Sequence, residues 1–169
     1  PGKKLLFMGG EFGQWDEWYH ERGLDWHLMD QGFNQGVQRW VKDLNRAHRR
    51  EDALHALDFE AGGFEWVDFQ DWPQSIISFI RKGEKAGEQI LVVCNFTPIP
   101  RRNYRVGVPT LGTWQELLNS DGKEYGGSGQ GNLGAVQAEA VPFKDKPFSV
   151  SLTLPPLAVL FLKSPQKAL

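Results

Sequence analysis

The chain has 169 residues, of which 40% are hydrophobic, and a formal net charge of −2. This length and composition suit one globular domain, or one domain with part of another, and argue against a disordered chain. The charge gives no support for binding to nucleic acid or to a membrane surface, and no apolar run is long enough to predict a transmembrane helix.

The first predicted element is a short buried strand. The apolar residues 5–8 lie between Lys3-Lys4 and Gly9-Gly10, a pattern typical of a strand covered on both faces in a parallel sheet. A polar and aromatic loop follows directly, and α/β enzymes place substrate contacts on loops of this kind. No earlier strand is available for pairing. The segment is therefore either an edge strand or the end of a larger sheet.

A helix is predicted next. The apolar side chains that recur at helical spacing are Val37, Trp40, Val41, Leu44 and Ala47. Asn34 precedes them and is a plausible N-cap. Residues 4–51 thus form one predicted β/α unit, which cannot be a domain by itself. We place a boundary near residue 52, which divides the chain into residues 1–52 and residues 53–169.

Beyond this boundary the apolar period changes from 3.6 towards 2. The predicted strands cover residues 64–69, 75–82, 89–96, 102–106, 113–118, 135–141, 148–154 and 158–162. Short strands separated by Gly and Pro turns argue for an antiparallel sandwich. Cys94 lies in one of these strands. We interpret it as an inert buried thiol, and as the only cysteine it excludes an internal disulfide and fits a reducing compartment, the cytoplasm.

No complete active site is predicted from the residues alone. A two-carboxylate hydrolase needs carboxyl groups about 5 to 9 Å apart across one bond, and spacing does not select such a pair among the acids of the first loop. Those acids are Glu11, Asp16, Glu17, Glu21 and Asp25. The four histidines form no metal-ligand motif, and the glycine-rich residues 126–132 lack the Gly-Lys-Ser/Thr ending of a phosphate loop, so we expect no metal and no cofactor.

Several motifs, taken together and in order, closely resemble bacterial 1,4-α-glucan (glycogen) branching enzymes of the α-amylase type. They are residues 1–14, Glu17-Trp18, residues 24–26, 36–39, 57–59, 63–66, 95–98 and 152–157. The resemblance implies a (β/α)8 barrel followed by an antiparallel C-terminal sandwich. Residues 4–8 would be the last barrel strand, residues 37–50 the last barrel helix, and the chain from about residue 53 the sandwich. The expected fold class is therefore mainly β, an α-amylase C-terminal sandwich preceded by one β/α unit.

The resemblance also implies a reaction. Branching enzymes carry out a retaining transglycosylation, in which a carboxylate nucleophile opens an α-1,4 bond and the 6-hydroxyl of another chain attacks the covalent intermediate. The product is an α-1,6 branch in glycogen. In this family the three catalytic carboxylates lie on earlier barrel strands, whose motifs are absent from this sequence. We therefore expect no catalytic residue here, and an inactive chain when it is tested alone.

The resemblance places residues 9–26 at the barrel rim beside the glucan cleft. The candidate substrate-binding residues are Glu11, Gln14, Trp15 and Trp18 in this loop and Trp66 in the sandwich. Expected partners are α-glucans such as glycogen and amylose-type chains, and the missing barrel, with no nucleic acid and no membrane. The alternatives are a self-standing glucan-binding module and a purely structural sandwich of another α-amylase relative. Without barrel neighbours, residues 5–8 should expose apolar surface.

Overall fold

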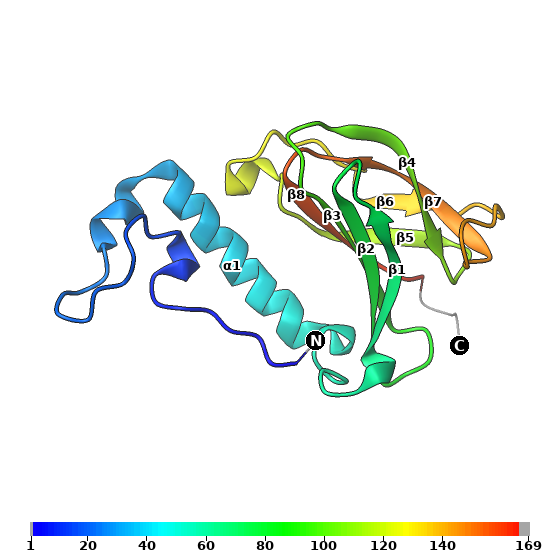
Figure 1. Cartoon of the computed structure of the whole chain (residues 1–169), viewed down its shortest axis with the longest axis horizontal. Helices are drawn as coiled ribbons and strands as arrows, with labels where there is room; N and C mark the ends of the chain where they lie inside the picture. Colours follow the sequence, from blue (N-terminus) through cyan, green and yellow to red (C-terminus); the bar gives the residue numbers. More distant parts are fainter. Residues whose placement is uncertain (1, 166–169) are drawn as a thin grey trace.

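Two antiparallel sheets pack face to face, and one long helix lies beside the larger sheet (Figure 1). The computed structural model describes residues 2–165. The larger sheet has six strands in the order β1 (Phe64–Asp71), β2 (Ile76–Lys82), β3 (Gln89–Asn95), β8 (Ala158–Lys163), β5 (Thr113–Asn119) and β6 (Ala135–Gln137). The smaller sheet pairs β4 (Arg101–Val108) with β7 (Phe148–Leu154). This arrangement confirms the predicted antiparallel sandwich.

The helical elements are concentrated before the sandwich. The long helix is α1 (Gly32–Arg50). Short 3-10 turns are η1 (Gly10–Phe12), η2 (Trp26–Asp30), η3 (Asp52–Leu54), η4 (Ala61–Gly63) and η5 (Lys123–Tyr125). α1 covers the face of the six-stranded sheet that is turned away from β4 and β7, as Figure 1 shows.

Alternation along the central strand β3 explains why its sheet is covered on both sides. Leu91 and Val93 point into the core between the two sheets, which also contains the fully buried Trp114. Ile90 and Val92 point the other way and pack with Ala47 of α1 and Leu54 of η3. A strand with two buried faces reads as a continuous apolar run, as this one does.

α1 is held against the sandwich at η5 by contacts on both elements. Trp40 packs edge-to-face on Tyr125 with ring centroids 5.0 Å apart, and the Tyr125 hydroxyl donates to Asp43 at 2.9 Å. Gly36 makes this approach possible, because a Cβ atom there would lie 2.2 Å from the backbone oxygen of Tyr125. The helix and the 3-10 turn therefore touch backbone to backbone.

We expect Gly36→Ala to destabilise the fold by about 1–3 kcal/mol, although alanine is the better helix former by about 1 kcal/mol. The added methyl group must push η5 and α1 apart. Gly32→Ala is the matched control, since a Cβ at that helical glycine meets nothing within 4 Å. Urea unfolding of both variants checks the prediction. Equal stability of Gly36→Ala and Gly32→Ala would contradict it.

The structure differs from the sequence-based prediction at residues 4–8, which form no strand. A strand needs a neighbour for its backbone N–H and C=O groups, and within residues 2–165 no strand lies alongside this segment. The side chains of Leu5, Leu6, Phe7 and Met8 are exposed, as expected without barrel neighbours. Lys4 ties the segment to the start of the sandwich, through a bond of 2.6 Å from its Nζ to Asp58.

Two further boundaries need correction. The helix begins at Gly32 with Gln31 at the N-cap position, so Asn34 is not the N-cap. Its buried side chain instead donates to the backbone oxygens of Phe12 and Gly13 at 2.9 and 3.0 Å. The strand predicted at residues 135–141 ends at Gln137. Beyond that point the chain crosses to the smaller sheet, where Glu139 bridges Ser149 of β7.

Candidate functional site

The loop of residues 9–26 is shaped by contacts at its two ends. Gly9 has a φ of 83°, and a Cβ atom there would lie 2.8 Å from the side chain of Gln14. Both the backbone conformation and the lack of space therefore favour glycine at this position. Phe12 is fully buried and packs on Trp26, with ring centroids 5.1 Å apart. Asn34 of α1 holds the backbone of this turn, so the loop is fixed to the helix.

Gln14, one of the predicted substrate contacts, uses both ends of its amide within the loop. Its Nε2 donates to the backbone oxygen of Asp16 at 3.0 Å, and its Oε1 accepts from the backbone N–H of Asp25 at 2.9 Å. The second of these bonds joins the start of the loop to its end. The structure thus gives Gln14 a role in holding the loop's shape.

The other predicted loop residues present more surface. Trp15 is 73% exposed and Trp18 is 38% exposed, with its ring edge-to-face on Phe7 at 5.7 Å. Glu11 lies half-buried in η1. The loop therefore presents two indoles and one carboxylate that a ligand could contact.

The remaining loop acids are mostly occupied. Arg22 lies 3.1 Å from a carboxylate oxygen of Asp16 and 3.8 Å from one of Asp25. Glu21 accepts a hydrogen bond from the Tyr19 hydroxyl, which raises the pKa of that phenol. Each of these three carboxylates therefore has a partner within its own loop.

Trp66 stands apart from the loop, on β1. It belongs to an aromatic cluster with Phe64, Phe69 and Phe79, at centroid distances of 4.9, 5.5 and 5.9 Å. It remains 47% exposed, so one part of the ring packs and another part faces solvent. Figure 1 places the loop and the start of β1 near opposite ends of α1. The predicted residues therefore form two separate surfaces.

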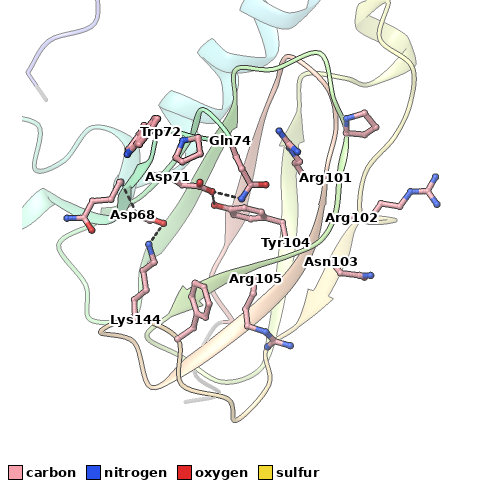
Figure 2. Close-up of a pocket in the computed structure, with 14 residues that line it drawn as sticks. Asp68, Asp71, Trp72, Gln74, Arg101, Arg102, Asn103, Tyr104, Arg105 and Lys144 are labelled. Carbon is pink, nitrogen blue, oxygen red and sulfur yellow. Dashed lines mark hydrogen bonds and ion pairs between the residues drawn. The ribbon is translucent and has the colours of Figure 1, made fainter.

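A third surface was missed by the sequence reasoning. It is a shallow groove of about 790 Å³ between the edge strands β1 and β4, drawn in Figure 2. We call it the edge groove. Its lining residues are Asp68, Gln70, Asp71, Trp72, Pro73, Gln74, Pro100, Arg101, Arg102, Asn103, Tyr104, Arg105, Phe143 and Lys144. In the sequence, the segment Asp71-Trp72-Pro73 indicates only a turn. Nothing in it shows that β4, some thirty residues further along the chain, lies beside it in the fold.

Hydrogen bonds order the floor of the edge groove. Asp71 accepts from the Tyr104 hydroxyl at 2.6 Å and from the Gln74 amide at 3.0 Å. Burial, followed by the hydrogen bond to Asp71 and the charges of Asp71 and Asp68, raises the pKa of Tyr104 above its ordinary value. Lys144 forms an ion pair with Asp68 across the groove's lower end.

Other kinds of site find little support in residues 2–165. No group of three His, Cys, Asp or Glu side chains there could hold a metal ion. No helix in this part of the chain has the length and apolar character needed to cross a membrane. Cys94 is only partly buried, unlike the buried thiol that was predicted, but this burial raises the pKa of the thiol to about 11, so little of the reactive thiolate forms at neutral pH.

The curated relatives are branching enzymes. The "1,4-alpha-glucan branching enzyme GlgB" of Aquifex aeolicus (strain VF5) is 62% identical over 163 residues, which cover 96% of this chain and 26% of the relative. The enzyme of the same name from Aromatoleum aromaticum is 56% identical over 162 residues, with coverages of 96% and 25%. The match falls on the C-terminal region of these enzymes, and the chain spans about a quarter of their length.

Among solved structures, the trehalulose synthase MutB from Pseudomonas mesoacidophila MX-45 matches with a TM-score of 0.44 and 20% identity over 76% of this chain and 18% of MutB. A likeness this distant supports no inference about function. A family model gives the stronger result: it matches residues 66–165, which include every strand of the sandwich except the first two residues of β1. The chain therefore belongs to the family described as alpha amylase, C-terminal all-beta domain.

Proposed function

We propose that this chain forms the C-terminal part of a 1,4-α-glucan branching enzyme of glycogen biosynthesis. Such an enzyme cleaves an α-1,4 bond of a glucan and transfers the freed chain to a 6-hydroxyl, which makes an α-1,6 branch. One observation carries the proposal: the 62% identity to a branching enzyme extends over 96% of the chain, through the loop of residues 9–26 as well as the sandwich. The proposal places the protein in the cytoplasm, in agreement with its single, inert cysteine.

Within this proposal, the loop contributes a wall of the glucan cleft. Trp15 and Trp18 offer exposed indole faces to sugar rings, and Glu11 offers a carboxylate acceptor for sugar hydroxyls. Gln14 acts indirectly, because its amide is used to hold the loop. The catalytic carboxylates come from the barrel, which the proposal makes the chain's essential partner.

A chimaera tests this function. The corresponding C-terminal segment of the Aquifex aeolicus enzyme is replaced by this chain, and both the chimaera and the isolated chain are incubated with amylose. New branches are counted after enzymatic debranching. We expect branching by the chimaera and none by the chain alone. Turnover by the isolated chain, or a folded chimaera that makes no branches, would contradict the proposal.

A second function, glucan binding by the sandwich itself, is favoured by Trp66. Its ring is partly exposed although it sits in an aromatic cluster that could have buried it. Maltooligosaccharides should then bind saturably to the isolated chain, and Trp66→Ala should abolish binding at this site. Absence of binding at millimolar ligand would count against this function while leaving the chimaera test unaffected.

A further inference from the structure

We propose that the edge groove is a second α-glucan site, at which the indole of Trp72 stacks on a glucose ring and the side chains around Asp71 bind its hydroxyls. This inference rests on the proposed function, which supplies the substrate class. The groove lies between the two sheets, on residues that none of the predicted contacts includes.

Trp72 is an aromatic surface that the fold does not use. Its side chain is 83% exposed, and its ring stacks on no other aromatic ring among residues 2–165. Its backbone is nevertheless fixed, because its carbonyl accepts from the N–H of Ser75 at 3.1 Å in a turn where Ser75 has a φ of 52°. An exposed indole on a fixed backbone presents a large apolar face and loses only two side-chain rotations on binding, which suits the apolar face of a sugar ring.

Polar groups next to the indole offer both donors and acceptors. Figure 2 shows Asp71, Gln74 and Tyr104 between Trp72 on one side of the groove and Arg101 on the other. Asp71 receives two hydrogen bonds from its neighbours and retains acceptor capacity, since a carboxylate has about four lone-pair sites. Both of these bonds end on Oδ2, so a sugar hydroxyl can donate to the Oδ1 atom of Asp71. The Gln74 amide uses one N–H on Asp71 and has a second that can donate to the sugar.

Bulges on both strands that border the groove shape it. On β4, three residue steps from Arg101 to Tyr104 oppose two on β7, and Asn103 in this bulge has a φ of 54°. On β1, register shifts occur between Trp66 and Asp68 and between Asp68 and Asp71. Bulges redirect side chains and are common next to binding sites. Here they fall on the stretches that supply the groove's polar groups.

The charged groups of the groove are of both signs. Lys144 pairs with Asp68, and Arg105 lies 2.7 Å from Glu139, whereas Arg101 and Arg102 have no ion-pair partner among the described residues. Phosphate is therefore the competing ligand that the test must include. The indole, the amides and the carboxylate beside them are the groups that recognise an uncharged oligosaccharide.

The test is a titration of the ¹⁵N-labelled chain with maltoheptaose, followed through the indole N–H signals of its tryptophans. The Trp72 signal is identified by its absence in Trp72→Phe, and the Gln74 side-chain amide serves as a second reporter. The experiment is done in the Trp66→Ala background, so that a site at Trp66 does not contribute. We expect both signals to shift and saturate together.

Variants separate recognition from general surface effects. Trp72→Ala should weaken binding by about tenfold or more, as measured at the Gln74 signal. Tyr104→Phe should weaken binding several-fold, because Asp71 loses the hydrogen bond that orients its carboxylate. Phe59→Ala is the matched control, since Phe59 is an equally exposed aromatic, at 82%, that does not line the groove. It should bind as the parent does. Equal losses in Trp72→Ala and Phe59→Ala would overturn the proposal.

Other ligands complete the test. Cellohexaose or inorganic phosphate that shifts the Trp72 signal at lower concentrations than maltoheptaose would overturn the assignment to α-glucan. No Trp72 shift, in a chain whose chimaera branches amylose, would overturn the groove and leave the proposed function standing. A saturable Trp72 shift together with an inactive chimaera would overturn the proposed function and leave the edge groove standing as a glucan site.

Discussion

Replacing Asp58 with asparagine is expected to lower the free energy of unfolding by about 3–5 kcal/mol, the usual cost of breaking a buried ion pair from one side. Asp58 accepts from Arg81 at 2.5 Å, and both side chains are more than nine-tenths buried. Arg81 has a second bond, from its Nε to the backbone oxygen of Gly63 at 3.1 Å, so it cannot turn out to solvent without further loss. An amide in place of the carboxylate leaves the guanidinium charge uncompensated.

Urea unfolding measures this effect. Asp52→Asn serves as the control, because Asp52 is half-exposed and meets only His55, at 3.9 Å. Its effect should stay within about 0.5 kcal/mol. A loss below 1 kcal/mol in Asp58→Asn would show that water reaches Arg81 and that the pair is not a buried one.

The Asp58 effect should also depend on pH, in a direction set by its pKa. Burial alone would raise the pKa of Asp58, but hydrogen bonds from Lys4 and Arg81 and their positive charges outweigh it and hold the pKa below its ordinary value. A depressed pKa stabilises the folded state above the unfolded value, about 4, and this stabilisation disappears as the pH falls through the folded pKa. The stability difference between the parent and Asp58→Asn should therefore be full at pH 7 and shrink in acid below about pH 4.

Trp114→Ala is the second large effect that we expect, at about 3–5 kcal/mol. The indole is completely buried in the core between the sheets, and its N–H donates to the backbone oxygen of Thr110 at 3.1 Å. Truncation would leave a large cavity and an unpaired carbonyl. The midpoint of urea unfolding should fall accordingly, with little change in the slope.

Trp15→Ala is a suitable comparison for Trp114→Ala, because it removes the same side chain from an exposed loop position. Its effect on stability should be within about 0.5 kcal/mol. If the two tryptophan variants unfold at the same urea concentration, Trp114 is not the core anchor that the structure indicates.

The sandwich could be predicted from the sequence because its signals are local. Each of the eight strands predicted between residues 64 and 162 is present, one of them shortened to Ala135–Gln137, since alternation of apolar residues and Gly or Pro turns act over a few positions. The helix was also predicted, but its start was misplaced: Asn34 has the residue type of an N-cap, yet its side chain is used for a tertiary contact with the backbone of η1. Residue type alone cannot separate these two uses of an asparagine.

The remaining differences depend on groups far apart in the chain. An apolar run at residues 5–8 has strand propensity, but a strand forms only where a neighbour supplies hydrogen bonds. The edge groove is a similar case, because Trp72 and Arg101 line one groove only where the two sheets pack and their edge strands bulge. No periodicity in the sequence reports where two sheet edges will face each other.

Because α1 packs on η5, the loop of residues 9–26 and the sandwich should unfold together when the protein is heated. The helix carries the loop of residues 9–26 through Asn34, and it is itself held by Tyr125 of the sandwich. When the sandwich melts, α1 loses the surface on which it packs, and the loop loses its anchor in the same transition. The working temperature of the loop is therefore set by the sandwich, and changes that make the sandwich more heat-resistant would protect the loop without altering any of the loop's own residues.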